Sequence, residues 1–316
     1  MFKNIVVFNM NRTLKITSDL LKEKLSDFRF SPCGSHDIKK SGFVPHIKGY
    51  EELFYEANGQ FLLNILSEEK ILPAAVINDF LADRIELFEE NNGRKPKKTE
   101  KEQLKDQIIM ELLPRAFSKH NKVQVWIDSI DGLIIVNSGS SNKAEDALAL
   151  IRKAFGSLPV TPLTPNKSPD IVMTEWVKTG VGENGLTPTD EVELKSSVDE
   201  GVVTSKKQDL QSDEILNHIE SGKFVSKLSF DFEERMTLLL TSDLLIKKIK
   251  MSDVVEEKII ENLGDDESAE AKFGAEFLIY TDEIIKLIKA VIKSFDCETQ
   301  EDGYNEHIMD DEKEEE

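Results

Sequence analysis

The chain has 316 residues, 39% of them hydrophobic, and a net charge of −20. This length allows a substantial core and suggests two or three domains. No apolar run approaches the ~20 residues that a membrane-spanning helix needs. The first residues lack the features of a signal peptide, so we expect a cytoplasmic protein. Cys33 and Cys297 form no CxxC pair, which fits a reducing compartment and excludes a cysteine-based zinc cluster.

The first part of the chain predicts short strands joined by tight turns. An apolar run at residues 5–8 predicts a buried strand. Asn58-Gly59 and Asp131-Gly132 each separate two predicted strands, and such pairs are typical of type I′ hairpin turns. Residues 30–50, which contain several glycines, prolines and lysines, are expected to form a loop. A helix is predicted over residues 143–155, because its apolar residues share one face.

Between these strands, the segment from about residue 70 to residue 117 predicts two helices folded back on each other as a projecting finger. Gly93 can adopt the left-handed conformation that ends the first helix. Thr99 and Glu102 have the spacing of a capping box, which predicts the start of the second helix. The apolar residues that would join the helices recur at steps of three or four: Ile77, Leu81, Ile85, Phe88, Leu104, Ile108 and Leu112.

The turn of this predicted finger is basic, although the chain as a whole is acidic. Residues 94–105 have a local charge of +4, and the following segment RAFSKHNK contains Lys119 and no acidic residue. A solvated loop between helices is one interpretation. Because crowded like charges repel one another unless an anion lies among them, the other interpretation is a finger that contacts phosphates. The basic residues of the turn are Arg94, Lys95, Lys97, Lys98, Lys101 and Lys105.

The second half predicts a further mixture of strands and helices. The segment GSLPVTPLTPNKSP, with its four prolines, predicts a boundary between an N-terminal domain (1–160) and a C-terminal domain (161–295). Several strands alternate apolar and polar residues, as in an antiparallel sheet with one face in solvent. A strand at 277–280 is expected to lead into a helix at 282–295. The mixed order of elements predicts an α+β fold with largely antiparallel sheets.

The last residues form an acidic tail. Residues 296–316 contain eleven acidic residues and one lysine, so they supply −10 of the net charge. Such a composition is typical of a disordered, solvated end. The alternative is an internal mimic of DNA that competes for a basic surface.

No motif of a known catalytic site is present. The sequence contains no GxxxxGK[ST] or GxGxxG phosphate loop, no HExxH and no GxSxG. Its five histidines are scattered, and His36 and His46, which share a loop, have no ligand set beside them. We therefore expect a protein that is not an enzyme and that needs no metal or cofactor.

Several segments, in order along the chain, resemble the RdgC family of recombination-associated proteins. The resemblance covers nearly the whole chain apart from the acidic tail. The segments are SPCGSHD (31–37), EEKILP (68–73), KKTEKEQLKD (97–106), LLPRAFS (112–118), WID…GLIIV (126–136), KAEDALALIRKAFGSLPV (143–160), TEWV (174–177), VELK (192–195) and KKQDL…EILNHIESGK (206–223).

The resemblance implies a ring-shaped homodimer that encircles duplex DNA without sequence preference, associates with the nucleoid and restrains the RecA recombinase. Phe117 matches an aromatic position expected at a joint between subunits, although a core phenylalanine is the alternative. Pro96 departs from the family pattern and leaves the loop shape open. The residues expected to contact DNA are Arg94, Lys95, Lys97, Lys98, Lys101, Lys119, Lys206, Lys207 and Gln208.

A second class of function stays open. The chain could contact RecA or another partner directly, with the acidic tail as the docking segment and DNA binding as a secondary property.

Overall fold

The computed structural model describes residues 2–10, 16–47, 49–262 and 268–298. Most of the predicted acidic tail, from residue 299 onward, therefore lies outside the described residues. The chain divides into two compact units, and the strands β4 and β5 each pass from one unit to the other. Unit 1 comprises Met1–Leu21, Tyr55–Leu62 and Gln124–Glu316, and unit 2 comprises Lys22–Phe54 and Leu63–Val123.

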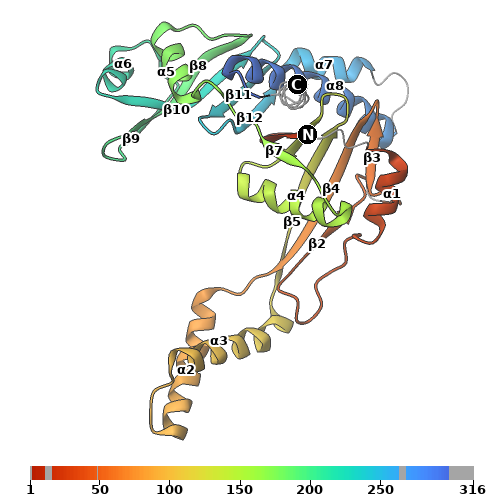
Figure 1. Cartoon of the computed structure of the whole chain (residues 1–316), viewed down its shortest axis with the longest axis vertical. Helices are drawn as coiled ribbons and strands as arrows, with labels where there is room; N and C mark the ends of the chain where they lie inside the picture. Colours follow the sequence, from red (N-terminus) through yellow and green to blue (C-terminus); the bar gives the residue numbers. More distant parts are fainter. Residues whose placement is uncertain (1, 11–15, 48, 263–267, 299–316) are drawn as a thin grey trace, which may run out of the picture. The chain divides into compact units, whose positions relative to one another are not determined.

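Unit 1 is built on an open antiparallel sheet with the strand order β4-β5-β6-β1-β12-β11-β10-β8-β9 (Figure 1). In addition, β3 pairs with β4, and β7 pairs with β1. The strands are β1 (Ile5–Met10), β3 (Phe54–Ala57), β4 (Gln60–Lys70), β5 (Ser118–Asp128), β6 (Leu133–Asn137), β7 (Val160–Pro162), β8 (Leu186–Ser196), β9 (Val202–Lys206), β10 (Lys223–Phe232), β11 (Met236–Thr241) and β12 (Ile246–Met251).

Helices bury one face of the β8–β12 part of this sheet. Trp176 lies 5.7 Å from Phe230 of β10 and 5.5 Å from Phe295 between ring centroids, so α5 and α8 cover the same face. Along β10, Leu228, Phe230 and Phe232 are buried, whereas the residues between them are partly exposed. The other face of β8–β12 is therefore open and polar. The helices of unit 1 are α4 (Ser141–Phe155), α5 (Pro169–Thr179), α6 (Asp213–Glu220), α7 (Asp253–Asn262) and α8 (Ala269–Phe295).

The central strand β1 is buried throughout, unlike β10. Ile5 and Val7 belong to the same core cluster as Trp176 and α8, and the side chains between them point to the opposite face of the sheet. This explains why the sequence shows a continuous apolar run at β1 and an alternating pattern at β10.

Unit 2 contains a short strand pairing and a pair of helices. The strand β2 (Lys39–Val44) pairs antiparallel with β4, in a segment where the sequence predicted a loop. The prediction is wrong for these six residues only, and the described residues of 30–50 on either side form neither helix nor strand. Gly42 lies in the strand, where a Cβ atom would be only 2.4 Å from the Cα of Phe30. Glycine is needed there for close approach of two chain segments, not for a turn. The helices that lie at least partly in this unit are α1 (Ser18–Ser26), α2 (Ala74–Asn92), α3 (Lys98–Leu112) and the 3₁₀ turn η1 (Leu113–Arg115).

The helices α2 and α3 pack against each other as a hairpin. Ile77 and Leu81 of α2 contact Ile108 of α3, and all three side chains are buried. Arg84 also pairs with Glu111 at 2.8 Å between the two helices. That this hairpin projects as a finger remains a prediction. Partly buried residues that complete the contact are Leu72, Ile85, Leu104, Ile109 and Leu112.

The turn between α2 and α3 is held by one carboxylate. Gly93 is left-handed with φ 64°, as predicted for the end of α2. The predicted capping box of Thr99 and Glu102 is wrong, because α3 already begins at Lys98. The Glu100 carboxylate instead accepts hydrogen bonds from the Lys97 N–H at 2.7 Å and from the two terminal nitrogens of the Arg94 guanidinium at 2.7 and 2.8 Å. The acid that reaches back is therefore the one three residues after the actual cap.

Two further predictions in unit 1 have clear outcomes. Asn58 and Gly59 have φ angles of 52° and 74°, which confirms the predicted turn between β3 and β4. The predicted strand at 277–280 is wrong, because α8 is one helix from Ala269 to Phe295. Thr281 does not cap a new helix; its hydroxyl donates to the Phe277 carbonyl at 2.8 Å within the helix.

The proline-rich segment is not a plain linker. The segment contains β7, whose Val160 and Pro162 pair with Met10 and Phe8 of β1. A domain boundary at this point remains a prediction.

The helix α7 was not predicted from the sequence. Within the described part of the chain, no helix has the length and apolar character needed to cross a membrane.

The carboxylate that holds the α2–α3 turn yields a test by pH. Hydrogen bonds from Arg94 and then from the Lys97 N–H lower the pKa of Glu100 from 4.5 to about 2. Glu100 should therefore stabilise the turn fully above about pH 4.5 and lose this effect as the pH falls toward about 2. An NMR titration of the Glu100 carboxyl group should show this low midpoint. In Arg94→Gln the midpoint should rise toward the ordinary value, and an unchanged midpoint would contradict the assignment.

Candidate nucleic-acid interface

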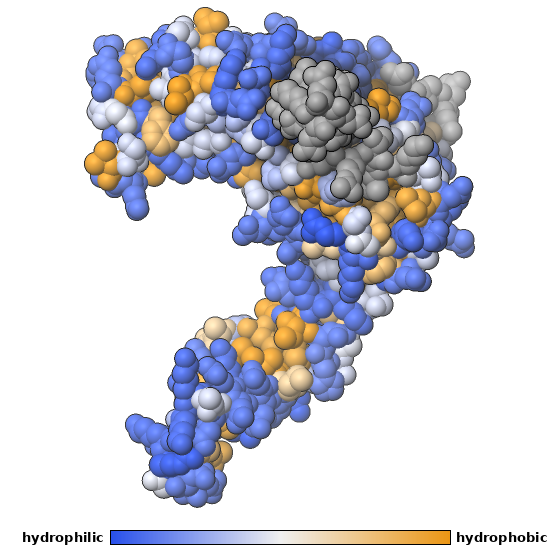
Figure 2. All heavy atoms as spheres, viewed as in Figure 1, coloured by the Kyte–Doolittle hydropathy of each residue, from blue (hydrophilic) through white to orange (hydrophobic). Residues whose placement is uncertain are grey.

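The turn of the α2–α3 hairpin presents lysines to solvent. Lys95, Lys97, Lys98 and Lys101 are all exposed. Among the residues that the structure describes, none of these four forms an ion pair. Figure 2 shows a mostly hydrophilic surface over the turn end of the hairpin, and a hydrophobic area nearer its other end. The four ammonium groups are thus available to an external anion.

Arg94 differs from these lysines because it already forms an ion pair with Glu100 inside the turn. Its guanidinium makes two hydrogen bonds to Glu100, and it lies 5.3 Å from the centroid of the Phe88 ring. A bidentate pair with a carboxylate fixes both side chains in one geometry. Arg94 therefore shapes the turn, and a phosphate would have to compete with Glu100 for it.

Beyond α3, the predicted aromatic residue lies on the surface. Phe117 is 85% exposed, so the interpretation as a core phenylalanine is wrong for the single chain. Its backbone is nevertheless fixed, because its carbonyl accepts a hydrogen bond from the Ile71 N–H at 2.7 Å. Ile71 is itself 44% exposed. Lys119, two residues later, pairs with Glu69 at 3.1 Å.

The remaining predicted DNA contacts lie in unit 1, at the end of β9. Lys206, Lys207 and Gln208 are exposed. Lys206 pairs with Glu191 of β8 at 3.5 Å, and the Gln208 N–H donates to the Asp190 carbonyl at 3.4 Å. Lys207 has a left-handed φ of 55°, which is uncommon for a residue other than glycine, asparagine or aspartate. These three consecutive residues thus lie at the β9 edge of the sheet of unit 1, whereas the hairpin lysines belong to unit 2.

The open face of β8–β12 carries further lysines that the sequence analysis did not single out. Lys195, Lys227 and Lys248 come from β8, β10 and β12, and they form ion pairs with Glu193 or Glu191. The alternation of polar and apolar residues in β10 could have shown from the sequence that Lys227 lies on the polar face of the sheet. Strand order was needed to place the three lysines on one surface, because β12 and β8 are far apart in sequence.

No metal centre is apparent in the described ranges. Among those residues, no group of three or more His, Cys, Asp or Glu side chains could hold a metal ion.

Comparison with known proteins gives one consistent family. A family model described as "Putative exonuclease, RdgC" matches residues 1–298. The recombination-associated proteins RdgC of Yersinia enterocolitica and of Yersinia pestis are each 42% identical to this chain over 301 residues. Each alignment covers 95% of this chain and 99% of the relative. The family description names an exonuclease, whereas the relatives' names state an association with recombination. The match nonetheless confirms the resemblance seen in the sequence segments, and the chain belongs to the RdgC family.

Proposed function

We propose that the chain binds duplex DNA without sequence preference, encircles it as a ring-shaped homodimer and thereby restrains RecA during recombination. Membership of the RdgC family supports the link to recombination. The protein would act at the nucleoid, as a binding protein that leaves the DNA uncleaved.

The observation that carries this proposal is the group of lysines at the α2–α3 turn, which form no ion pair with any described residue. They are exposed in a chain whose net charge is −20. Repulsion between neighbouring ammonium groups is relieved when phosphates lie between them. Their side chains are long and flexible and provide no planar group for reading base edges, so they suit contacts to the DNA backbone. A phosphate-binding hairpin explains both the crowding and the exposure.

Removing two of these lysines tests the hairpin directly. Each lysine that neutralises a phosphate releases counterions, so the logarithm of affinity falls with the logarithm of salt by about 0.9 per contact. In Lys97→Ala/Lys98→Ala this slope should become shallower by about one to two units per subunit. The loss should be the same on unrelated duplexes, because backbone contacts do not read bases. Fluorescence anisotropy over a salt series measures both effects.

The matched control removes two other exposed lysines, in Lys143→Ala/Lys167→Ala. This variant has the same net charge as the hairpin variant but should keep the wild-type slope. The Lys97 N–H that donates to Glu100 persists in the hairpin variant, so the turn should remain folded. A wild-type slope in the hairpin variant would show that the hairpin does not touch DNA.

The proposed ring needs contacts between subunits, and Phe117 is our candidate for one of them. Burying a phenylalanine side chain is worth about 1.5–3 kcal/mol, and aromatic residues are enriched in the centres of interfaces. In a two-fold interface the same patch of each subunit meets its copy, so Phe117 of each subunit would be buried against the same residues of the other. A two-membered ring needs a second such contact elsewhere on each subunit.

Phe117→Ser should therefore weaken the dimer and loosen DNA binding without affecting the fold. Analytical ultracentrifugation over a range of concentrations should show a larger dissociation constant. The control is Ile130→Ser, because Ile130 is another exposed apolar residue, at 71% exposure. Unchanged dimerisation and unchanged DNA affinity in Phe117→Ser would reject this interface.

The same binding experiment separates the other candidate functions. A wild-type protein that shows no affinity for plain duplex but binds RecA would favour direct action on a protein partner. The family description calls for one further arm, in which an end-labelled duplex is incubated with the protein and Mg²⁺. Release of labelled nucleotides would identify an exonuclease and would overturn the proposal of binding without cleavage.

A further inference from the structure

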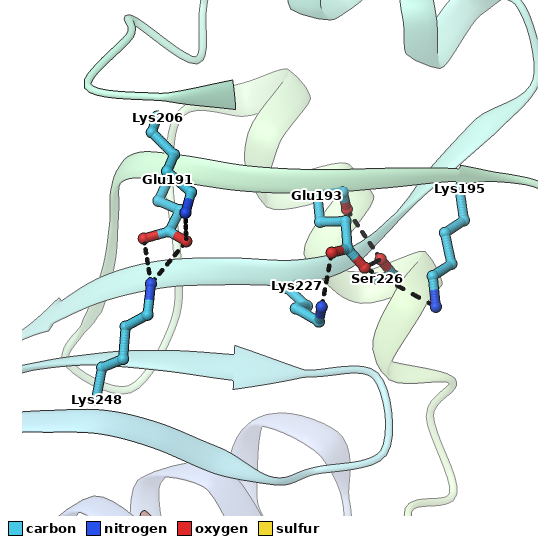
Figure 3. Close-up of polar contacts among 7 residues, drawn as sticks. All are labelled: Glu191, Glu193, Lys195, Lys206, Ser226, Lys227 and Lys248. Atoms are coloured by element: carbon cyan, nitrogen blue, oxygen red, sulfur yellow. Dashed lines mark hydrogen bonds and ion pairs between the residues drawn. The ribbon is translucent and has the colours of Figure 1, made fainter. Parts of the chain in front are cut away.

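The open face of β8–β12 carries two carboxylates, each surrounded by lysines (Figure 3). The two Glu191 oxygens lie 2.8 and 2.7 Å from the Lys248 Nζ, and Lys206 approaches to 3.5 Å. Glu193 accepts from the Lys227 Nζ at 2.6 Å, and Lys195 lies at 3.8 Å. Four lysines on four strands thus converge on two acids.

The lysines lie nearer to solvent than the acids that they surround. The side chains of Glu191 and Glu193 are 22% and 14% exposed. The four lysine side chains are between 36% and 60% exposed. A ligand arriving from solvent therefore meets ammonium groups first. Phosphate oxygens and carboxylate oxygens are equivalent acceptors for an ammonium donor, so a phosphate can take the place of either acid.

Lys248 has an unusual backbone that directs it to this position. It has a left-handed φ of 55°, and the register of β11 and β12 shifts beside it. A bulge of this kind turns a side chain away from the regular direction of the strand. The Lys248 N–H donates to the Asn4 side chain at 3.1 Å, which holds the bulged backbone. The side chain reaches Glu191 from a strand that is separated from β8 by β10 and β11.

A stabilising surface network is the simpler interpretation of these ion pairs. The lysines of these pairs are largely exposed, however, and ion pairs at the surface contribute little to stability. The core on the other face of these strands is formed by apolar side chains. Partial burial acts to raise the pKa of Glu191 and of Glu193, but the neighbouring lysines outweigh it and lower both pKa values. Both acids are thus charged at neutral pH, and each neutralises part of the lysine cluster.

We propose that the open face of β8–β12 binds the phosphodiester backbone of DNA, and that Glu191 and Glu193 occupy the phosphate positions until DNA displaces them. This inference rests on the proposed DNA binding. The two acids reduce the charge of the cluster from four positive charges to two. They hold the lysines in place without DNA and lower the affinity for any single small anion. A polyanion can compete because it offers several phosphates at once.

The test is to neutralise each acid while keeping its shape, in Glu191→Gln and, separately, in Glu193→Gln. Each change frees about one lysine charge, so the salt slope of duplex binding should become steeper by about 0.9 for each bound subunit. Each variant should therefore bind more tightly than the wild type. The affinity of each variant divided by that of the wild type should grow by about threefold per subunit as salt is lowered from about 200 to about 50 mM.

The control is Glu175→Gln on α5, which covers the opposite face of the sheet. Glu175 is an exposed acid that pairs with Lys178 at 3.5 Å, so the variant removes the same charge and a similar ion pair. It should keep the wild-type slope. Thermal unfolding of all variants provides a readout for a structural role. If Glu191→Gln unfolds at a markedly lower temperature than Glu175→Gln, then Glu193→Gln decides the test.

The outcomes separate this inference from the proposed function. Wild-type binding with equal or weaker binding in both glutamine variants would overturn the inference and leave DNA binding intact. No duplex binding by the wild type or by either variant would overturn both proposals. Tighter binding with a steeper slope in the glutamine variants, but not in Glu175→Gln, would support the inference.

Discussion

In the described part of the chain, helices cover only one face of the β8–β12 strands of unit 1, and the proposed interface on the other face depends on this. The core formed by Trp176, Phe230 and Phe295 needs only every second residue of a strand such as β10. The residues between them are released from packing and face solvent. Lysines from separate strands can then accumulate on one surface without disturbing the core. A sheet covered on both faces, as β1 is, would leave no such surface.

The hairpin of unit 2 contains two kinds of basic residue, one paired with a carboxylate and one exposed to solvent. One carboxylate, Glu100, joins Arg94 to the Lys97 N–H and thereby sets the path of the turn. The lysines around it have no such partner among the described residues. Two kinds of cation thus occupy one short segment: an arginine whose planar group suits a fixed bidentate pair, and lysines whose flexible ammonium groups suit a moving anion.

Carboxylates lie next to basic side chains both at the α2–α3 turn and on the open face of β8–β12. This reconciles the net charge of −20 with a proposed DNA-binding role. A strongly acidic protein is repelled by nucleic acid at long range, so contact has to depend on local clusters. Glu191 and Glu193 leave part of the charge of the lysine cluster uncompensated. Binding would then be sensitive to salt and readily reversible, which suits a protein that holds DNA without reading its sequence.

Sequence alone determined the features that depend on neighbours along the chain. Helical periodicity predicted α2 and α3, the Asn58-Gly59 pair predicted its turn, and alternation predicted a one-sided antiparallel sheet. The loop prediction failed at Gly42, which allows an approach to Phe30 on another chain segment. The strand predicted at 277–280 failed because α8 is one long helix through Thr281. Only the tertiary structure exposed Phe117 and brought Lys248 to Glu191. The physical reason is that strand order and packing decide which distant side chains meet, and no local pattern records them.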